Sequence, residues 1–165
     1  MGRTSTSEVA LRYSLAFVKP TTLGQDDVLD KLEGKGIRYI RLQWVDYTNI
    51  TRYRVIPLAI FRKLLSAPRP GIALSKAVLG IIGSSLAPGF SGTGEYLYTP
   101  DLNSTRLCGH APGHASLMGW FEETLPILEN TGNALTRKVP LCPRWLLEGI
   151  VKCVSVNYHA DIYNK

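Results

Sequence analysis

The chain has 165 residues and a mass of 18.2 kDa, and its 19 Lys+Arg against 13 Asp+Glu give a formal net charge of +6. This length is typical of one domain with tails, and it is too short for the complete active site of most large nucleotide-dependent enzymes. Hydrophobic residues at 45% and charged residues at 19% argue against wholesale disorder, and no apolar run is long enough to span a bilayer.

The cysteine content predicts reduced thiols. Cys108, Cys142 and Cys153 are widely spaced and include no C-x-x-C pair, so they are a poor disulfide framework. Free thiols are typical of a cytoplasmic protein. Residues 1–24 lack the apolar stretch of a secretory signal, and we expect them to form a flexible N-terminal arm.

The first predicted element is a short helix. Asp26 and Asp27 lie at its start, where the helix dipole favours acids, and Val28, Leu29 and Leu32 recur at helical spacing. A glycine at position 34 or 36 ends it.

The clearest segment covers residues 37–46. Ile40, Leu42 and Trp44 lie on one side of a period-two pattern, which indicates a half-buried strand. Residues 50–56 alternate again after a polar turn, so the two runs predict an antiparallel hairpin. Pro57 ends the second strand and begins an apolar-faced helix over 57–66, against which the three buried side chains of the first strand should pack.

The remaining elements predict an α+β fold with a small mixed sheet packed on helices. Residues 71–94 are rich in Gly, Ser and Ala, and we expect a long functional or interface loop there. Strands are predicted over 95–98 and 116–121. Residues 122–140 have the composition of a linker, and a helix begins at Pro143.

A possible metal site is suggested by Cys108, His110 and His114, which form a C-x-H-x3-H cluster. Zinc needs a fourth ligand, and only the distant Cys142 and His159 are available. The flanking glycines and proline fit a turn between strands, which is the interpretation we favour, and we assign no metal ligand.

The sequence contains a basic stripe that consists of Arg38, Arg41, Arg52, Arg54, Arg62 and Lys63. With the interleaved Tyr39 and Tyr53 it is compatible with a nucleic-acid face on a sheet. A solvated or subunit-facing surface is the favoured alternative, because the arginines of two strands need not share a face. The chain has neither a G-x-S-x-G elbow nor a P-loop, so the residues alone predict no self-contained catalytic constellation.

Several runs resemble the N-terminal region of the glutamine synthetase family over about residues 28–152. Residues 40–46 followed by 54–57 resemble its opening strand pair, which ends in Ile-Pro. The run Gly83-Ser84-Ser85-Leu86 resembles its Asp-Gly-Ser-Ser-Ile loop, and residues 94–101 resemble the following acidic strand that ends in Pro-Asp. Pro143-Arg144 resembles the Asp-Pro-Arg segment at the start of the next helix.

The resemblance implies a β-grasp-like N-terminal domain over 25–126, a linker over 127–142 and the beginning of the catalytic-domain region, truncated, over 143–165. In that family, ATP, glutamate and Mg²⁺ or Mn²⁺ are held mainly by a C-terminal domain. The N-terminal domain of a neighbouring subunit contributes the loop that closes the site. The family reaction joins glutamate and ammonia to make glutamine, a step of nitrogen metabolism.

Two departures bear on activity. Ile82 stands where the family's loop has its ammonium-binding aspartate, and the C-terminal domain is absent from this sequence. The resemblance therefore implies a fragment that is inactive alone, with self or full-length synthetase subunits as partners. It implies no catalytic residue here, and it makes Ser84, Ser85 and Glu95 candidate substrate-binding residues of an inter-subunit loop.

Two alternatives to a ligase fragment stay open. One is a non-catalytic interaction module that associates with full-length synthetase subunits. The other is a nucleic-acid-binding β-grasp module.

The resemblance stops after Lys152. Residues 153–165 contain β-branched and Asn residues and no sustained helical face, which favours a truncated or mis-spliced product over a divergent natural terminus. We expect such a product to leave Trp145, Leu146 and Ile150 of the last helix uncovered.

Overall fold

The computed structural model describes residues 25–128 and 135–158, which form an α+β protein with mixed sheets and helices. The expected arm over 1–24 lies outside these residues. Within them, no helix has both the length and the apolar character needed to cross a membrane. The chain divides into two compact units, of which the first holds described residues 25–44, 52–71 and 100–119, and the second holds 45–51, 72–99 and those from 120 onward.

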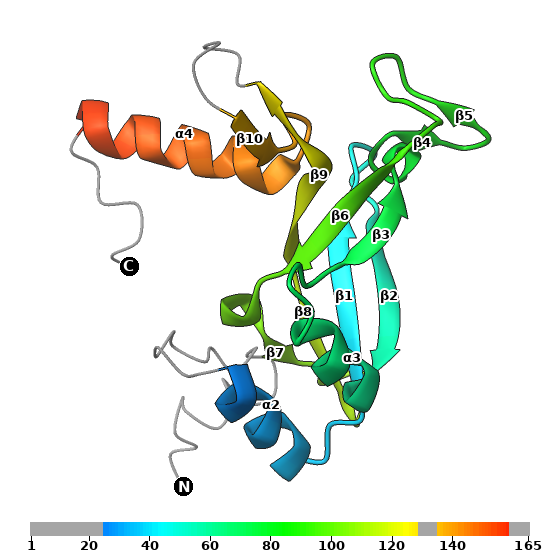
Figure 1. The fold of residues 1–165 in the computed structure, drawn as a ribbon, viewed down its shortest axis with the longest axis vertical. Coiled ribbons are helices and arrows are strands. Elements are labelled where there is room, and N and C mark those ends of the chain that lie inside the picture. Colours follow the sequence, from blue (N-terminus) through cyan, green and yellow to red (C-terminus); the bar gives the residue numbers. More distant parts are fainter. Residues whose placement is uncertain (1–24, 129–134, 159–165) are drawn as a thin grey trace, which may run out of the picture. The chain divides into compact units, whose positions relative to one another are not determined.

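The first unit is built on a four-stranded mixed sheet. Its strand order is β2-β1-β8-β7. The predicted hairpin is confirmed, because β1 and β2 are hydrogen-bonded neighbours and run in opposite directions (Figure 1). Strand β1 pairs in parallel with β8, and β8 pairs antiparallel with β7. The strands are β1 (Tyr39–Val45), β2 (Thr51–Pro57), β7 (Arg106–Leu107) and β8 (His114–Leu117).

Two helices supply the rest of this core. Helix α2 (Gln25–Gly34) and helix α3 (Leu58–Leu65) confirm the two predicted helices. Along β1 the inward side chains are buried and the alternate ones are exposed or half-buried, as the period-two pattern predicts. The core of the unit includes Leu29, Leu32, Ile40, Leu42, Trp44, Leu58, Phe61, Leu65 and Leu117.

Helix α3 is held at its start and at its middle. Pro57 provides the N-cap with φ −56°, and the Leu58 amide donates to the Arg38 carbonyl at 2.8 Å. The Arg62 guanidinium binds the Asp30 and Glu33 carboxylates of α2 at 2.8 and 3.1 Å. The hydrogen bond with Asp30 is the main reason that the pKa of Arg62 is raised. This part of the basic stripe is therefore occupied with joining two helices.

The turn between β1 and β2 belongs to the second unit and is organised by one buried carboxylate. Asp46, 3% exposed, accepts hydrogen bonds from the Thr48 amide, the Thr48 hydroxyl and the Ile50 amide. Asn49 occupies the left-handed region with φ 61°, which asparagine tolerates better than most residues. The Tyr47 amide donates to the Leu79 carbonyl at 2.9 Å, which ties the turn to the following segment.

The second unit has a four-stranded sheet of order β10-β9-β6-β3 and a small β4-β5 hairpin. Strand β3 pairs antiparallel with β6, and β9 with β10. Its core includes Leu74, Leu79, Tyr96, Tyr98, Phe121, Val139 and Cys142. The strands are β3 (Ile72–Ser75), β4 (Ile81–Ile82), β5 (Ser85–Leu86), β6 (Glu95–Pro100), β9 (Gly119–Leu128) and β10 (Leu135–Lys138).

Three expectations differ from this structure. Residues 71–94 are not one open loop, because they contain β3, the 3-10 helix η1 (Lys76–Leu79) and the β4-β5 hairpin. The described part of the expected linker forms the end of β9 and all of β10. The strand predicted over 116–121 is divided at Met118, whose amide donates to the Ser104 hydroxyl and whose carbonyl accepts from the Asp101 amide.

Helix α4 (Pro143–Tyr158) confirms the predicted helix start, but the helix persists through residues 153–158, where the sequence suggested that it would not. Trp145 is half-buried, and its indole N–H donates to the Phe121 carbonyl at 3.0 Å. Leu146, Leu147 and Ile150 are exposed, which confirms the expectation for Leu146 and Ile150 and corrects it for Trp145.

Two neighbours on α3 test the predicted core. Phe61 is fully buried, and Ile60 is 52% exposed on the same helix. Phe61→Ala should lower the free energy of unfolding by about 3–5 kcal/mol, because it leaves a cavity as well as losing buried area. Ile60→Ala should cost less than about 1 kcal/mol. Urea titrations of both variants measure the difference, and equal losses would contradict this assignment of the core.

Candidate functional site

The segment that resembles the family's site loop is a small exposed hairpin. Strands β4 and β5 pair at Ile81↔Leu86 and Ile82↔Ser85, and Gly83 turns the chain with φ 59°. Such a backbone conformation favours glycine. Ser84 and Ser85 are both exposed at this turn. The structure therefore brings these two predicted site residues together, with their hydroxyls available to a binding partner.

Ile82 gives the hairpin an apolar side chain at the position where the sequence resemblance implies the family's aspartate. It is 54% exposed, although an isoleucine in a two-residue strand normally favours burial. A carboxylate at this position would attract an ammonium ion, whereas isoleucine cannot. The hairpin surface thus offers hydroxyl groups and hydrocarbon.

A half-buried aromatic ring supports the hairpin. Phe90 lies so close to Gly80 that a Cβ atom at position 80 would approach the ring to 2.3 Å. The same ring packs edge-on against Tyr47, with centroids 5.2 Å apart. The Ala87 amide donates to the Gly80 carbonyl at 2.8 Å and closes the segment. These contacts fix the hairpin at its root while its tip stays exposed.

Glu95 is placed apart from the two serines. It is the first residue of β6, pairs with Ser75 of β3 and is exposed at the base of the segment. The adjacent Gly94 has φ 86°, and its carbonyl accepts from the Lys76 amide at 3.1 Å. Glu95 therefore lies at the root of the segment, and the serines lie at its hairpin turn.

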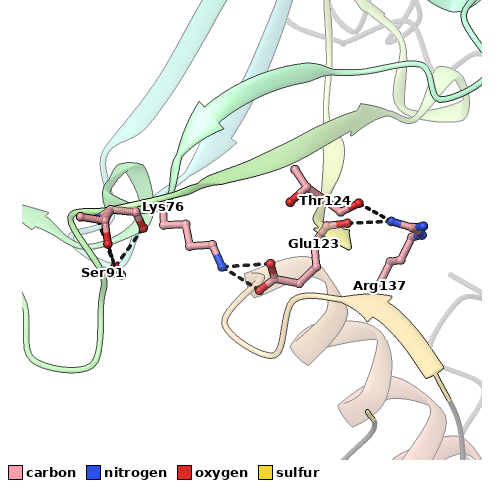
Figure 2. A network of polar contacts seen from close by, with 6 residues as sticks. Lys76, Ser91, Glu123, Thr124 and Arg137 are labelled. Carbon is pink, nitrogen blue, oxygen red and sulfur yellow. Dashed lines mark hydrogen bonds and ion pairs between the residues drawn. The ribbon is translucent and has the colours of Figure 1, made fainter. Parts of the chain in front are cut away.

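Lys76 anchors this base through its side chain as well (Figure 2). Its ammonium group contacts both oxygens of Glu123 on β9 at 3.1 and 2.9 Å and lies 4.7 Å from the centroid of the Tyr96 ring. The side chains of Lys76 and Glu123 are only 25% and 15% exposed, so water screens the pair less than an exposed one. Burial is the main cause that raises the pKa of Tyr96.

The sequence did not reveal this ion pair. Lys76 is the single charged residue in the stretch 71–94, but its partner lies 47 residues later in a segment with the composition of a linker. A lone lysine in an uncharged stretch is the one available signal, because a half-buried ammonium needs a carboxylate. Figure 2 also shows Arg137 of β10, whose guanidinium donates to the backbone carbonyls of Glu123 and Thr124.

A second cluster, which the sequence also missed, joins α4 to the β9–β10 hairpin. Trp120 and Trp145 pack with centroids 4.2 Å apart, Arg144 lies over the Trp120 ring, and Lys138 lies over the Trp145 ring. Beside it is an open cleft of about 460 Å³. The cleft is lined by Glu122, Pro126, Thr136, Arg137, Lys138 and Trp145.

The C-x-H-x3-H segment, for which a turn is favoured over a zinc site, forms no grouped set of metal ligands among the described residues, and His159 lies outside them. His114 is occupied by stacking on Tyr39 and by accepting a hydrogen bond from the Arg41 side chain at its Nδ1 atom. Cys108 is buried, and its amide donates to the His114 carbonyl, so the segment is a turn between β7 and β8. Across the part of the chain that the structure describes, no three His, Cys, Asp or Glu side chains are grouped to hold a metal ion.

No family model matches the sequence, but solved structures share its fold. Two structures of GmaS, one an ADP complex and one without ligand, share 16% identity with TM-scores of 0.54 and 0.55 and cover 79% and 80% of this chain. The chain has a glutamine synthetase-like fold. It spans about a quarter of those proteins, 26% and 27%.

Two further relatives are similar to parts of the chain. The crystal structure of a novel glutamine synthase homolog is 25% identical over 73% of this chain and 27% of that one, with a TM-score of 0.48. Protein fluG of Emericella nidulans is 27% identical over 103 residues, which are 61% of this chain and 12% of fluG. The fold shared with the two GmaS structures agrees with the sequence resemblance.

Breaking the ion pair at the base of the segment should destabilise the protein measurably. Lys76→Met removes the ammonium group that binds the half-buried Glu123 carboxylate, and we expect a loss of about 1–3 kcal/mol in the free energy of unfolding. The double variant with Glu123→Leu should recover part of this loss in a mutant cycle. Lys152→Met, which removes an exposed i,i+4 pair with Glu148, is the matched control and should cost about 0.5 kcal/mol or less. Equal costs for both single variants would contradict a special role for Lys76.

Proposed function

We propose that the chain is the N-terminal module of a glutamine synthetase-like ATP-dependent ligase and that it has no ligase activity by itself. The observation that carries the proposal is the β4-β5 hairpin. The residues that resemble the family's site loop form one exposed turn, fixed at its root and unobstructed at its tip. A glutamine synthetase-like fold around that turn supports the same assignment.

In this proposal the module works on a site that another subunit completes. Ser84 and Ser85 contact substrate or the neighbouring subunit through their hydroxyls, and Glu95 holds the base of the segment. ATP and the divalent cation bind elsewhere in the assembly. The described residues do not fit a Mg²⁺ or Mn²⁺ site, which needs several grouped oxygen ligands.

The proposed partners are copies of this chain or full-length synthetase subunits, and the proposed compartment is the cytoplasm, with a role in nitrogen metabolism. Cys108 and Cys142 are buried and Cys153 is exposed, and none of these three cysteines is in a disulfide bond. Thiols of this kind persist in a reducing compartment. A non-catalytic role in association with full-length subunits is the second form of this proposal, and the exposed Leu146, Leu147 and Ile150 on α4 favour it because exposed apolar surface stabilises association.

The expected biochemical result is an absence of turnover. The purified chain, supplied with glutamate, hydroxylamine, ATP and Mg²⁺ or Mn²⁺, should form no γ-glutamyl hydroxamate, because the described residues supply neither a metal site nor a carboxylate at position 82. A full-length synthetase assayed in parallel is the positive control. Hydroxamate formation that follows the chain through every purification step would overturn the proposal.

Association is tested separately by size-exclusion chromatography with light scattering. The chain mixed with a full-length synthetase-like protein should elute in a larger complex. Ser84→Arg/Ser85→Arg, which adds bulk and charge at the exposed turn, should weaken that complex, whereas Ser66→Arg at the exposed end of α3 should not. Complexes of equal strength for all variants would show that the hairpin is not in the contact.

A further inference from the structure

The outer face of the first unit's sheet carries an aromatic and arginine surface that the proposed ligase role does not use. Alternation along β1 turns Tyr39 and Arg41 to the side opposite the core. Register places His114 of β8 beside Tyr39 and Ser116 beside Arg41, and β7 adds Arg106 beside Ser116. Tyr53 of β2 completes the face, because Arg41 lies 4.8 Å from its ring centroid. We call these five side chains, Tyr39, Arg41, Tyr53, Arg106 and His114, the aromatic–arginine face.

The aromatic rings of this face are exposed and already arranged for stacking. Tyr39 is 42% and Tyr53 51% exposed, so both side chains present surface to solvent. The Tyr39 and His114 rings are stacked with centroids 4.9 Å apart at 24°. The Arg41 Nε–H donates to His114 Nδ1 at 3.3 Å. Each ring is thus fixed by a neighbour before any partner arrives.

The charge of this sheet has one sign. Its four strands contain four arginines and a histidine, and none contains Asp or Glu. Arg41 and Arg106 lie on the same face, two strands apart, so their Cα atoms are roughly 10 Å from each other. Ser116 lies between them and is small and only 9% exposed, so no long side chain fills the space between the two arginines. A cationic face with planar rings complements an anionic backbone that carries planar bases.

We propose that the aromatic–arginine face binds single-stranded nucleic acid, with bases stacked on Tyr39 and Tyr53 and phosphates near Arg41 and Arg106. A single strand fits better than a duplex, because its unstacked bases expose their faces to the protein rings. The face reads stacking and charge, so recognition is tolerant of sequence. Arg52 and Arg54 alternate with Tyr53 along β2 and lie on the opposite side of the strand, so they are outside this face.

The test is fluorescence anisotropy with the full chain and a fluorescein-labelled single-stranded RNA, with DNA of the same sequence and its duplex as competitors. Binding should be weakened about 5- to 150-fold by Tyr39→Ala or Tyr53→Ala, as expected for one lost stacking contact. Arg106→Gln should reduce the slope of log K against log salt by about 0.7, the value for one phosphate of a single strand.

Matched variants separate this face from general attraction to a basic protein. Tyr47→Ala removes an equally exposed tyrosine, 47% exposed, outside the sheet, and Lys63→Gln removes an exposed cation of α3. Both should leave binding within about twofold of the wild type if the face is the site. Preference for the duplex, equal loss with Tyr47→Ala and Tyr53→Ala, or the absence of binding at roughly 0.1 M salt would each overturn the proposal. Self-association that Tyr53→Ala abolishes, without nucleic-acid binding, would assign the face to a protein partner instead.

Thermal unfolding of each variant serves as the check that the sheet stays intact. Arg41→Lys is a second probe, because it keeps the charge but loses the planar guanidinium beside Tyr53. It should weaken binding without changing the salt slope. If neither Arg41→Lys nor Tyr53→Ala changed the affinity for single-stranded RNA, the proposal would also be overturned.

Discussion

The alternation of burial along β1 is the constraint on which most of the first unit depends. Ile40, Leu42 and Trp44 point into the core, and the residues between them point out. Because successive side chains point to opposite faces, a slip of one residue would exchange every one of them. The parallel register with β8 and the packing of the buried face of α3 require the same inward and outward assignment of the β1 side chains. One strand thus sets both the hydrophobic core and the outward aromatic–arginine face.

The second unit depends more on polar contacts between distant segments. Lys76 and Glu123 bring a 3-10 helix against β9, and a half-buried ion pair constrains geometry more than an exposed one because its partners cannot exchange freely with water. The Asp46 carboxylate does the same for the β1–β2 turn. The root of the hairpin with Ser84 and Ser85 is hydrogen-bonded to itself and follows the segment that binds the β1–β2 turn, while its tip is exposed.

The parts of the fold that the sequence predicted correctly are those encoded by local periodicity. The β1–β2 pair, α2, α3 and the start of α4 follow from alternation, helical spacing and proline positions. Strands β3 and β10 were missed because short strands acquire their stability from partners far away in sequence. At the candidate site, Ser84 and Ser85 could be placed on one turn, whereas the Lys76–Glu123 pair could not, since nothing local connects residues 47 apart. Helix α4 continues through β-branched positions because propensity is a weak constraint.

Gly80 limits how this protein can drift during evolution. A Cβ atom at position 80 would lie 2.3 Å from the Phe90 ring. The ring can therefore occupy its place only when residue 80 is glycine. A lineage that loses the glycine must first shrink the aromatic residue, and the intermediate with a smaller residue at 90 also loses the edge-on contact with Tyr47. An evolutionary replacement of both residues therefore passes through an intermediate in which the contact between residue 90 and the β1–β2 turn is weakened. Homologues that retain the hairpin should keep glycine and the aromatic ring as a pair or replace both.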